Sequence, residues 1–582
     1  MLIAVGAWAG WQLYTLGSNA MRLAALVDTV QQHAKRGDVQ ALIDDLYDVH
    51  RYSVAAYNAA SDPTLVALQQ VPGVGDDLRA AREVTKVARD LTAATGTIAS
   101  LAPRVAGNQV LTEDGRIDLT IIGTVHTAMT ELSTAAAAGS QRLGSLDSAS
   151  LLPQIGEPVD QLVRWLEQVP GAVDRAEPYL QLLPLLLGEN DERTWFVIMQ
   201  NLDEARPSGG LLASWLILHA DNGLIDVVAQ GTNNDLVAAG DVNYSHAMDA
   251  SYQDLWGDNL SGWLSMNLSA NFPDNARLMR DAWNARRDVQ VDGVVSFGQG
   301  TLPYLAAAVG PVKAGEKSIA PSDLEEYLRV GVYRDYEDPD AKDAIVASLM
   351  IQVFDKLMAG NLNLGYFLDT VTGHVSADRV QMWSSDSAVQ QIISAVGLTG
   401  EFQSTEGPVS TVRLVNAGGN KLDAFVDLDI AYQLGDCETD EDYGVDWRTS
   451  TMTVTLTNSV PNGLPPYMTG RLDLTAAGID PSSVELGSNR DFVVVYAPVG
   501  ATIAATTVDD EPALVRYATL SRRPVAVFDI DVDPGTSRTM AVTWSEPATS
   551  SAGDPLSTTP DVVLPPLANH ATLTLEPGNA CR

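Results

Sequence analysis

The chain is poor in cysteine, in histidine and in basic side chains, and each scarcity disfavours a class of function. Its 582 residues include two cysteines, Cys437 and Cys581, and no Cys/His spacing suits a zinc site. The seven histidines are scattered and predict no metal-binding cluster. No GxSxG elbow, Walker loop or HExxH motif occurs. Ordinary hydrolase and zinc chemistry are therefore disfavoured.

Positive charge is also scarce. Lysine and arginine total 36 residues against 74 aspartates and glutamates, which gives a formal net charge of -38. This excess argues against nucleic acid, and against an anionic membrane surface, as a general partner, because both carry charge of the same sign. Any site for an anion must therefore be a local exception in an acidic protein.

The N-terminal segment, residues 1–21, carries no charged residue before Arg22. Its length approaches the roughly 20 apolar residues that span a bilayer, and no small-x-small cleavage site follows it. We expect a retained transmembrane signal anchor, with the bulk of the chain extracytoplasmic; a buried N-terminal helix is the alternative. Lys35 and Arg36 lie after the segment and no basic residue precedes it, which the positive-inside rule disfavours unless the true start lies upstream.

The remaining chain is too long for one hydrophobic core, and its patterning changes twice. Residues 22–187 are alanine-rich with apolar residues at helical spacing, which predicts a helical extracytoplasmic region that packs on itself or a partner, or serves as a spacer. Residues 188–402 alternate β-rich runs with helical patterns, which predicts an α/β layered domain. The expected strands are 194–200, 210–220, 224–230, 291–297 and 380–383, and the expected helices are 275–286, 321–330 and 340–358.

Residues 403–582 predict a β-sandwich, because short apolar runs alternate with clusters of Pro, Gly, Asn and Asp. A disulfide between Cys437 and Cys581 would tie the last strand of this domain to its first, outside the cytosol. The acidic cluster beside Cys437 could bind calcium, although it lacks the EF-hand pattern, or could be a solvated loop. Its members are Asp436, Glu438, Asp440, Glu441, Asp442 and Asp446.

The segment QNLDEARPSGG, residues 200–210, follows the apolar run TWFVIM and is typical of a strand whose exit loop presents polar groups. Asn201 and Glu204 supply an amide and an acid, and Arg206 offers a planar fork for phosphate or carboxylate. Gly209 and Gly210 would let the backbone approach a bound group closely.

Further polar residues stand at the predicted start of a helix and in a later loop. Asn271, Asp274 and Arg277 lie in NFPDNARL, where free helix amides favour anions. Arg334 and Lys342 lie in VYRDYEDPDAKDAIV. Gathered on one rim, these cations would form a phosphate pocket; taken singly, each would form a surface ion pair.

The order of several motifs resembles an actinobacterial family called domain of unknown function 4012. They are QNLDEARPSGG, NGLIDV, NFPDNARL, VDGVVSFGQGTLPYLAAAVGPV, VYRDYED and VQMWSSD, with VPGVGDDLRAAREV and LLPLLLG upstream. That family in turn resembles the LytR-CpsA-Psr phosphotransferases, which move glycopolymers from a polyprenyl pyrophosphate carrier to peptidoglycan outside the membrane.

The second resemblance implies roles for individual residues. Arg206, Arg277 and Arg334 would neutralise a pyrophosphate, with Asn201, Asn271 and Lys342 as further ligands. Glu204 would help to hold Mg²⁺, and Asp274 would act as the base for an acceptor hydroxyl. Where those enzymes carry a Pro-Arg-Asp loop, however, this chain has QGTNND, with Asp235 as its only acid and no arginine.

The sequence thus predicts a membrane-anchored, extracytoplasmic protein of the cell envelope. Its α/β domain would bind a polyprenyl phosphate or a glycopolymer of the cell wall, and could transfer the glycan. The alternative is a non-catalytic envelope scaffold or assembly protein that acts through protein partners, which the missing cationic loop favours.

Overall fold

The computed structural model describes residues 2–36, 39–106, 111–112, 114–240, 250–257, 262–359, 379–402, 405–440, 445–564, 566–569 and 571–581. These residues form two compact units. The first draws on Met1–Arg193, Ala220–Ile225 and Lys356–Asp369; the second draws on Thr194–His219, Asp226–Asp355 and Thr370–Arg582. The protein is therefore multidomain, with a helical N-terminal region and several β-sheets.

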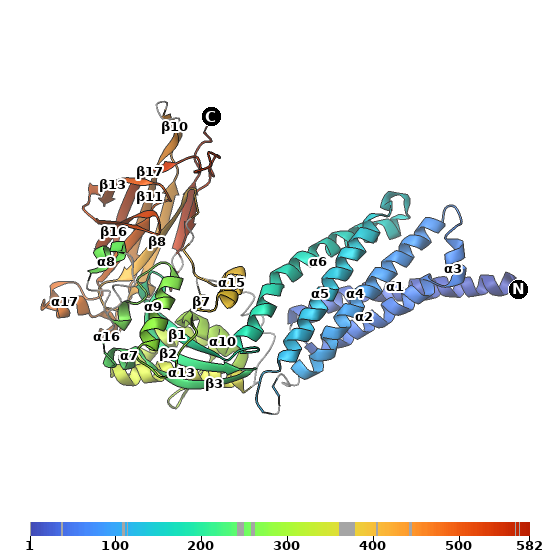
Figure 1. Ribbon diagram of the computed structural model, residues 1–582, viewed down its shortest axis with the longest axis horizontal. Helices are drawn as coiled ribbons and strands as arrows, with labels where there is room; N and C mark the ends of the chain where they lie inside the picture. The colour runs from blue at the N-terminus through green and yellow to red at the C-terminus, as the bar shows by residue number, and fades with distance from the viewer. Residues whose placement is uncertain are drawn as a thin grey trace. The chain divides into compact units, whose positions relative to one another are not determined.

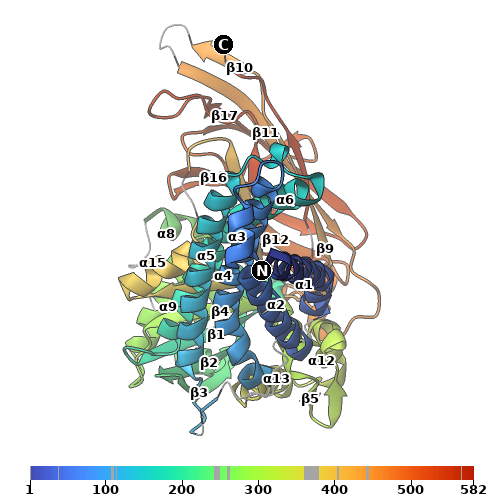
Figure 2. The same ribbon diagram turned by 90° about the vertical axis from the view of Figure 1, so that its right-hand side faces the viewer.

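Long helices build the first unit. They are α1 (Leu2–Arg36), α2 (Val39–Ala60), α3 (Pro63–Leu68), α4 (Gly75–Ala106), α5 (Leu119–Gly144), η1 (Ser148–Ser150) and α6 (Pro153–Leu186). Helix α1 packs on α2, α2 on α4, α4 on α5 and α5 on α6 (Figure 2). Small residues let the helices approach: a Cβ on Gly139 of α5 would lie 2.7 Å from Val87 Cγ1 of α4. In the part of the chain that the structure describes, no helix has the length and apolar character that crossing a bilayer requires, so the anchor expected over residues 1–21 is unsupported.

A five-stranded sheet organises the α/β part of the second unit, in the order β3-β2-β1-β4-β7 (Figure 1). Strands β1 and β4 are parallel, whereas β4 and β7 are antiparallel. The strands are β1 (Arg193–Arg206), β2 (Gly209–Asp221), β3 (Leu224–Thr232), β4 (Gly293–Gly298) and β7 (Val380–Ser384), with a separate hairpin of β5 (Val312–Ala314) and β6 (Lys317–Ile319).

Helices accompany this sheet, and α9 packs against both β4 and β7. Proline near the start of α9, at Pro273, suits a helix N-terminus, where its missing amide leaves no bond unmade. The helical elements are α7 (Asn233–Ala238), α8 (Ala250–Trp256), η4 (Trp263–Ser265), α9 (Phe272–Asn284), η5 (Gln299–Thr301), α10 (Leu302–Val309), η6 (Pro321–Asp323), α11 (Leu324–Glu326), η7 (Tyr327–Gly331), α12 (Val332–Asp335), α13 (Pro339–Met358) and α15 (Ser387–Ala395).

Two packed sheets form the C-terminal sandwich. One has the order β14-β13-β17-β11-β9-β19 with β10 paired to β11, and the other has the order β15-β16-β12-β8-β18. The strands are β8 (Val409–Asn416), β9 (Val426–Gln433), β10 (Cys437–Asp440), β11 (Val445–Asn458), β12 (Asn489–Tyr496), β13 (Thr502–Val508), β14 (Glu511–Pro512), β15 (Arg516–Leu520), β16 (Arg523–Val532), β17 (Ser537–Pro547), β18 (Asp561–Val563) and β19 (Ala571–Glu576). Short helices occur between these strands in the chain order: η8 (Asp423–Phe425), α16 (Pro466–Thr469), α17 (Leu472–Ala476) and η9 (Pro481–Ser483).

The sheet that contains β8, β12 and β16 is buried on both faces, which explains why these strands read as continuous apolar runs. Val412 and Val493 pack in the core of the sandwich, whereas Val415 and Val494 join a second core with Phe196 of β1. The α/β sheet and the sandwich therefore belong to one compact unit, and the predicted boundary at residues 402/403 separates two chain segments that share a hydrophobic core.

Cys437 at the start of β10 and Cys581 after β19 form a disulfide with a sulfur–sulfur distance of 2.06 Å. The bridge closes a loop with a sequence separation of 144 residues. Strand β19 pairs in parallel with β9, so the bridge fastens the C-terminal segment at the sheet that it completes.

Candidate functional site

Residues 200–206 continue strand β1 and do not form the exit loop that the sequence pattern predicts. The parallel pairing of β1 with β4 ends at Gln200 and Gly298, and β1 then runs on to Arg206 before a two-residue turn leads into β2. Gly209 has a φ of 144°, and a Cβ there would lie 1.7 Å from the side-chain oxygen of Gln200. The glycine pair thus serves close strand packing in a hairpin.

A buried polar network holds this extension of β1 against the sandwich. The carboxylate of Asp423 accepts a 2.6 Å hydrogen bond from the amide of Ala205 and further bonds from the side chains of Asn416 and Asn489. Burial raises the pKa of Asp423 to about 6, against the hydrogen bonds that it accepts. The pKa of its neighbour Asp491 is raised well above the ordinary range, first by burial and then by the charge of Asp423.

Arg206 belongs to the same network. Its Nη1 donates to the carbonyl of Ala205 at 2.9 Å and to the carbonyl of Asn416 at 3.2 Å. Burial lowers its pKa, and the acids Glu204 and Asp423 oppose that shift. The guanidinium predicted to grip a ligand thus joins two segments of the second unit.

Glu204 accepts hydrogen bonds and charge from protein neighbours. Asn201 Nδ2 donates to Glu204 Oε2 at 2.9 Å, and Lys421 Nζ lies 3.1 Å from the same oxygen. Burial lowers the pKa of Lys421 and is the largest single effect, but the charge and hydrogen bond of Glu204, together with the charges of Tyr467 and Asp343, outweigh it, so the pKa is raised. A carboxylate already neutralised by an ammonium group is a poor ligand for Mg²⁺, which prefers several hard oxygen donors. The donor set therefore does not fit the Mg²⁺ role.

Lys342 is buried beside this pair. Its Nζ pairs with Asp343 Oδ1 at 2.5 Å and lies 5.1 Å and 5.2 Å from the ring centroids of Tyr333 and Tyr467. Lys421 Nζ lies 4.7 Å from the same Tyr467 ring. Two of the predicted ligands, Glu204 and Lys342, therefore lie in one neighbourhood, where each is already compensated by an opposite charge.

A second group of predicted residues forms a local cluster at the start of α9. Arg277 Nη1 donates to Asp274 Oδ1 at 2.7 Å, and Asn271 Nδ2 donates to Asp274 Oδ2 at 2.8 Å. Asn271 also accepts from the amide of Phe402 at 3.0 Å. Arg334 is exposed on α12. Among the described residues, the hydrogen bonds and ion pairs of Arg206 and Arg277 go to different partners and do not join the two arginines.

The segment QGTNND forms the end of β3 and the start of α7. Thr232 and Asp235 make a reciprocal capping box, in which Asp235 Oδ2 accepts from the Thr232 amide at 2.7 Å. A capping box satisfies amides that the first helical turn leaves free. The only acid of this segment is thus used to begin a helix.

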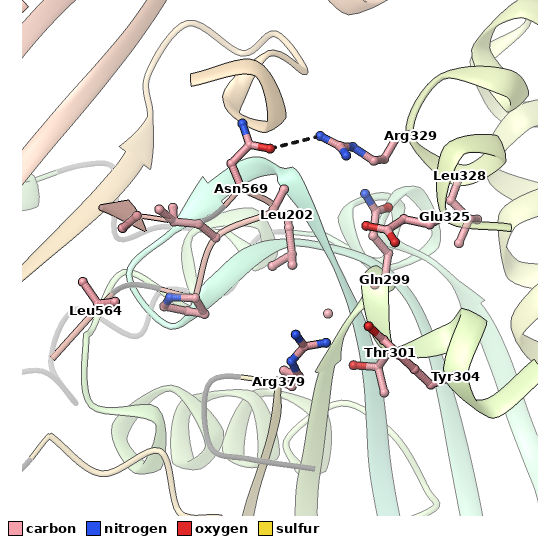
Figure 3. A pocket seen from close by; sticks show the side chains of 16 residues that line it. Leu202, Gln299, Thr301, Tyr304, Glu325, Leu328, Arg329, Arg379, Leu564 and Asn569 are labelled. Atoms are coloured by element: carbon pink, nitrogen blue, oxygen red, sulfur yellow. Dashed lines mark hydrogen bonds between the residues drawn. The ribbon is translucent and has the colours of Figure 1, made fainter. Parts of the chain in front are cut away.

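A cavity of about 310 Å³ opens beside β1 and β4, at the carboxyl end of β4 (Figure 3). We call it the sheet-end pocket. In α/β sheets, ligands commonly bind outside the carboxyl ends of the strands. The residues that line the pocket include Gly298, Gln299, Gly300, Thr301, Tyr304, Glu325, Arg329, Arg379 and Asn569.

Two arginines from different elements approach the sheet-end pocket. Arg329 comes from η7, and its Nη2 donates to Ala424 O at 2.9 Å and to Asn569 Oδ1 at 3.4 Å (Figure 3). Arg379 precedes β7 and lies 5.5 Å from the ring centroid of Tyr304. Among the described residues Arg379 has no ion-pair partner. Its guanidinium is therefore available to an anion in the pocket.

The main chain is also accessible to a ligand in this pocket. Gly300 follows the carboxyl end of β4, and a Cβ built on it would meet nothing within 4 Å. It lies in the turn η5 that leads into α10. A ligand can therefore come close to the main chain at this point.

Asp203 lies beneath the sheet-end pocket and is fully buried. Its carboxylate accepts from Gln299 Nε2 at 3.0 Å, and Arg329 Nε lies 3.8 Å from its other oxygen. Burial raises the pKa of Asp203 to about 7, against the opposing effects of Arg329 and of the Gln299 hydrogen bond. The pocket therefore has a titratable carboxyl group behind its arginine.

Sequence reasoning missed Arg329, Arg379 and Gln299. The signal was present in part, because GQGT stands inside one of the motifs that carries the family resemblance. Arg379 reaches this place through the chain topology: β7 runs antiparallel to β4, which brings the start of β7 beside the end of β4. No local motif reveals that pairing.

The acidic cluster near Cys437 lies partly outside the described residues, which exclude Glu441 and Asp442. One group with metal-like spacing occurs among the described residues, formed by Cys437, Asp446 and Cys581. Both of its sulfurs are used in the disulfide, so it offers no thiolate to a metal. His246, His374 and His570 also lie outside the described residues.

Comparison with known proteins gives one family match. A model of the family described as "Protein of unknown function (DUF4012)" matches residues 190–333, which include β1, the start of α9 and the GQGT turn. The match supports the resemblance to that family of unknown function. It does not extend to the LytR-CpsA-Psr phosphotransferases.

The other comparisons add little. No curated protein matches the chain. A candidate nutrient-binding protein from Legionella pneumophila is similar in structure at 8% sequence identity and a TM-score of 0.16. The similarity covers 25% of this chain and 43% of that protein, so the chain spans less than half of its length.

Proposed function

We propose that this protein works in the cell envelope, outside the cytoplasmic membrane, and that its sheet-end pocket binds the phosphate group of a polyprenyl phosphate or of a phosphate-bearing glycopolymer. One observation carries the proposal. Arg379 has no ion-pair partner among the described residues, and it lines a cavity at the carboxyl end of β4 together with the open backbone of Gly300. A guanidinium beside accessible main chain suits a phosphate group.

One feature of the structure, the disulfide, supports the envelope setting. A disulfide that closes a long loop is typical of proteins folded in an oxidising compartment. The membrane anchor remains part of the proposal and is tested separately, by fractionation of cells that produce the full chain.

We propose binding without glycan transfer. The expected base Asp274 is paired with Arg277, and Glu204 is paired with Lys421. The place of the cationic loop is taken by a helix-capping box. Phosphoryl transfer depends on positioned cations that neutralise the charge that develops in the transition state. Here the predicted acids are paired with protein cations instead.

The test uses the full-length protein and calorimetric titration with farnesyl phosphate, inorganic phosphate and farnesol. We expect both phosphates to bind and farnesol to bind at least tenfold more weakly. Arg379→Ala should remove most of the affinity, since one charge-assisted hydrogen bond contributes about 1.5–3 kcal/mol. Gly300→Leu should narrow the pocket without straining the backbone, because its φ is outside the left-handed region.

Arg334→Ala is the matched control, because Arg334 is an exposed arginine of the same unit and does not line the pocket. It should bind as the unmodified protein does. Saturating phosphate ligands that produce no heat and no thermal stabilisation would overturn the binding proposal and favour a scaffold that acts through protein partners.

A further inference from the structure

A second cavity, of about 370 Å³, lies in the same unit and contains two nearly buried arginines. We call it the arginine pocket. Arg413 from β8 and Arg523 from β16 line it, with 6% and 1% of their surfaces exposed. The alternation along β8 explains the placement: Val412 and Leu414 point into the core of the sandwich, so Arg413 points to the opposite face.

Arg413 has backbone partners and, in the part of the chain that the structure describes, no carboxylate partner. Its Nη1 donates to Val412 O and to Val563 O, each at 3.1 Å, and its buried Nε has no hydrogen-bond partner among the described residues. Within the described residues it forms no ion pair. Burial lowers its pKa to about 10, opposed only by Tyr496. A buried charge without an opposite charge is costly, so such a group normally has an anionic partner.

The walls of the arginine pocket combine charged and apolar side chains. Arg523 Nη1 donates to Val409 O at 2.6 Å, and its guanidinium lies 5.1 Å from the ring centroid of Phe402. Apolar residues continue the wall beside these two side chains. They are Pro207, Ala270, Val563, Leu564 and Pro566.

Two exposed acids, Glu401 and Asp561, also line the cavity. Together with Arg413 and Arg523 they give the lining a net charge of zero when all four side chains are ionised. A ligand that carries one negative charge therefore meets less repulsion than a doubly charged phosphate ester does. The volume lies at the lower end of the range for small-molecule sites.

We propose that the arginine pocket is a binding site for a small organic monocarboxylate, whose carboxylate lies against the guanidinium of Arg413 and beside Arg523, and whose apolar body packs on Phe402 and Val563. The site is separate from the sheet-end pocket, although Leu564 and Pro566 border both. It does not depend on the proposed envelope function.

The test titrates the full-length protein with 4-bromobenzoate, phenyl phosphate and benzyl alcohol. We expect 4-bromobenzoate to bind most tightly, because it combines one charge with an apolar ring. Arg413→Met should weaken that binding roughly tenfold or more, the loss expected for a charge-assisted hydrogen bond. Arg538→Met is the matched control, since Arg538 lies on β17 and does not line the cavity; it should bind normally.

A crystal of the unmodified protein with 4-bromobenzoate gives a measurement that does not require the variant to fold. Bromine anomalous density inside the arginine pocket, with the carboxylate toward Arg413, supports the proposal. Density only elsewhere, no binding, or equal binding of benzyl alcohol would overturn it. Tighter binding of phenyl phosphate would overturn the assignment to a monocarboxylate. Arg379→Ala should leave 4-bromobenzoate binding unchanged, so failure of the sheet-end pocket and failure of this site are distinguishable.

Discussion

Lys421 Nζ lies 3.1 Å from Glu204 Oε2, and both side chains are almost fully buried. Glu204 comes from the extension of β1, and Lys421 comes from the connection between β8 and β9. The acid that the sequence offered as a metal ligand is thus half of an ion pair inside the second unit. Its neighbour Asn201 donates to the same oxygen.

Loss of one partner of this pair should be more harmful than loss of both. Lys421→Met leaves a buried carboxylate without its cation, and we expect a loss of about 3–5 kcal/mol in the free energy of unfolding. The double variant Lys421→Met with Glu204→Gln should recover much of that loss, because neither charge remains. Urea denaturation of the single and double variants measures the difference; equal losses in both would contradict the pairing.

The buried carboxyl group of Asp203 should make stability depend on pH. Its pKa is raised from 3.8 to about 7, so between these values the folded protein holds a proton that the unfolded chain releases. Stability from this group therefore falls as the pH rises from about 4 to about 7 and is constant above that. As the pH rises across this window, the free energy of unfolding of Asp203→Asn should increase relative to that of the unmodified protein.

Urea denaturation at several pH values tests this expectation. Asp281→Asn serves as the control, because 63% of the Asp281 side chain is exposed. It should follow the unmodified protein at every pH. If the free energies of unfolding of Asp203→Asn and of the unmodified protein changed in parallel with pH, Asp203 would not titrate as expected.

Arg206→Ala should reduce stability and leave ligand binding in the sheet-end pocket intact. The guanidinium donates to the carbonyls of Ala205 and Asn416, and its loss removes the cation that lies near buried acids. We expect a loss of roughly 1–3 kcal/mol from unsatisfied buried groups. Thermal unfolding and farnesyl phosphate titration of the same preparation measure both effects. Lost binding with unchanged stability would restore Arg206 as a ligand residue.

Reduction of the disulfide should destabilise the sandwich. The bridge closes a loop with a separation of 144 residues, which corresponds to about 4–5 kcal/mol in the chain-entropy model. The variant Cys437→Ser with Cys581→Ser should therefore unfold at lower denaturant concentration, as should the unmodified protein under a reducing agent. If the reducing agent further destabilised the double variant, the effect would not come from this bridge.

The sequence predicted the main layers because their signals are local. Helical spacing over residues 22–187 and alternating runs after residue 188 correspond to α1–α6 and to the sheets. The end of β1 was misread as a loop, because Asn201, Glu204 and Arg206 are polar and because the distant partners of Glu204 and Arg206, Lys421 and Asn416, lie more than two hundred residues away. A strand buried by distant polar groups has no local pattern that distinguishes it from a binding loop.

The candidate site was less accessible to sequence reasoning for the same reason. Arg329 and Arg379 both line the sheet-end pocket, and strand order and strand direction place Arg379 there. Arg277, which the sequence favoured, forms an i,i+3 pair with Asp274 instead. Such a pair is a common outcome for an exposed helical arginine.

The most direct test of the proposed function is the position of a phosphate group in a crystal of the full-length protein with farnesyl phosphate. We predict phosphate density within hydrogen-bond distance of Arg379, beside Gly300, and its loss in Arg379→Ala crystals grown with the same ligand. Phosphate density at Arg206 and Arg277 instead, or no density in the sheet-end pocket at saturating ligand, would contradict the account.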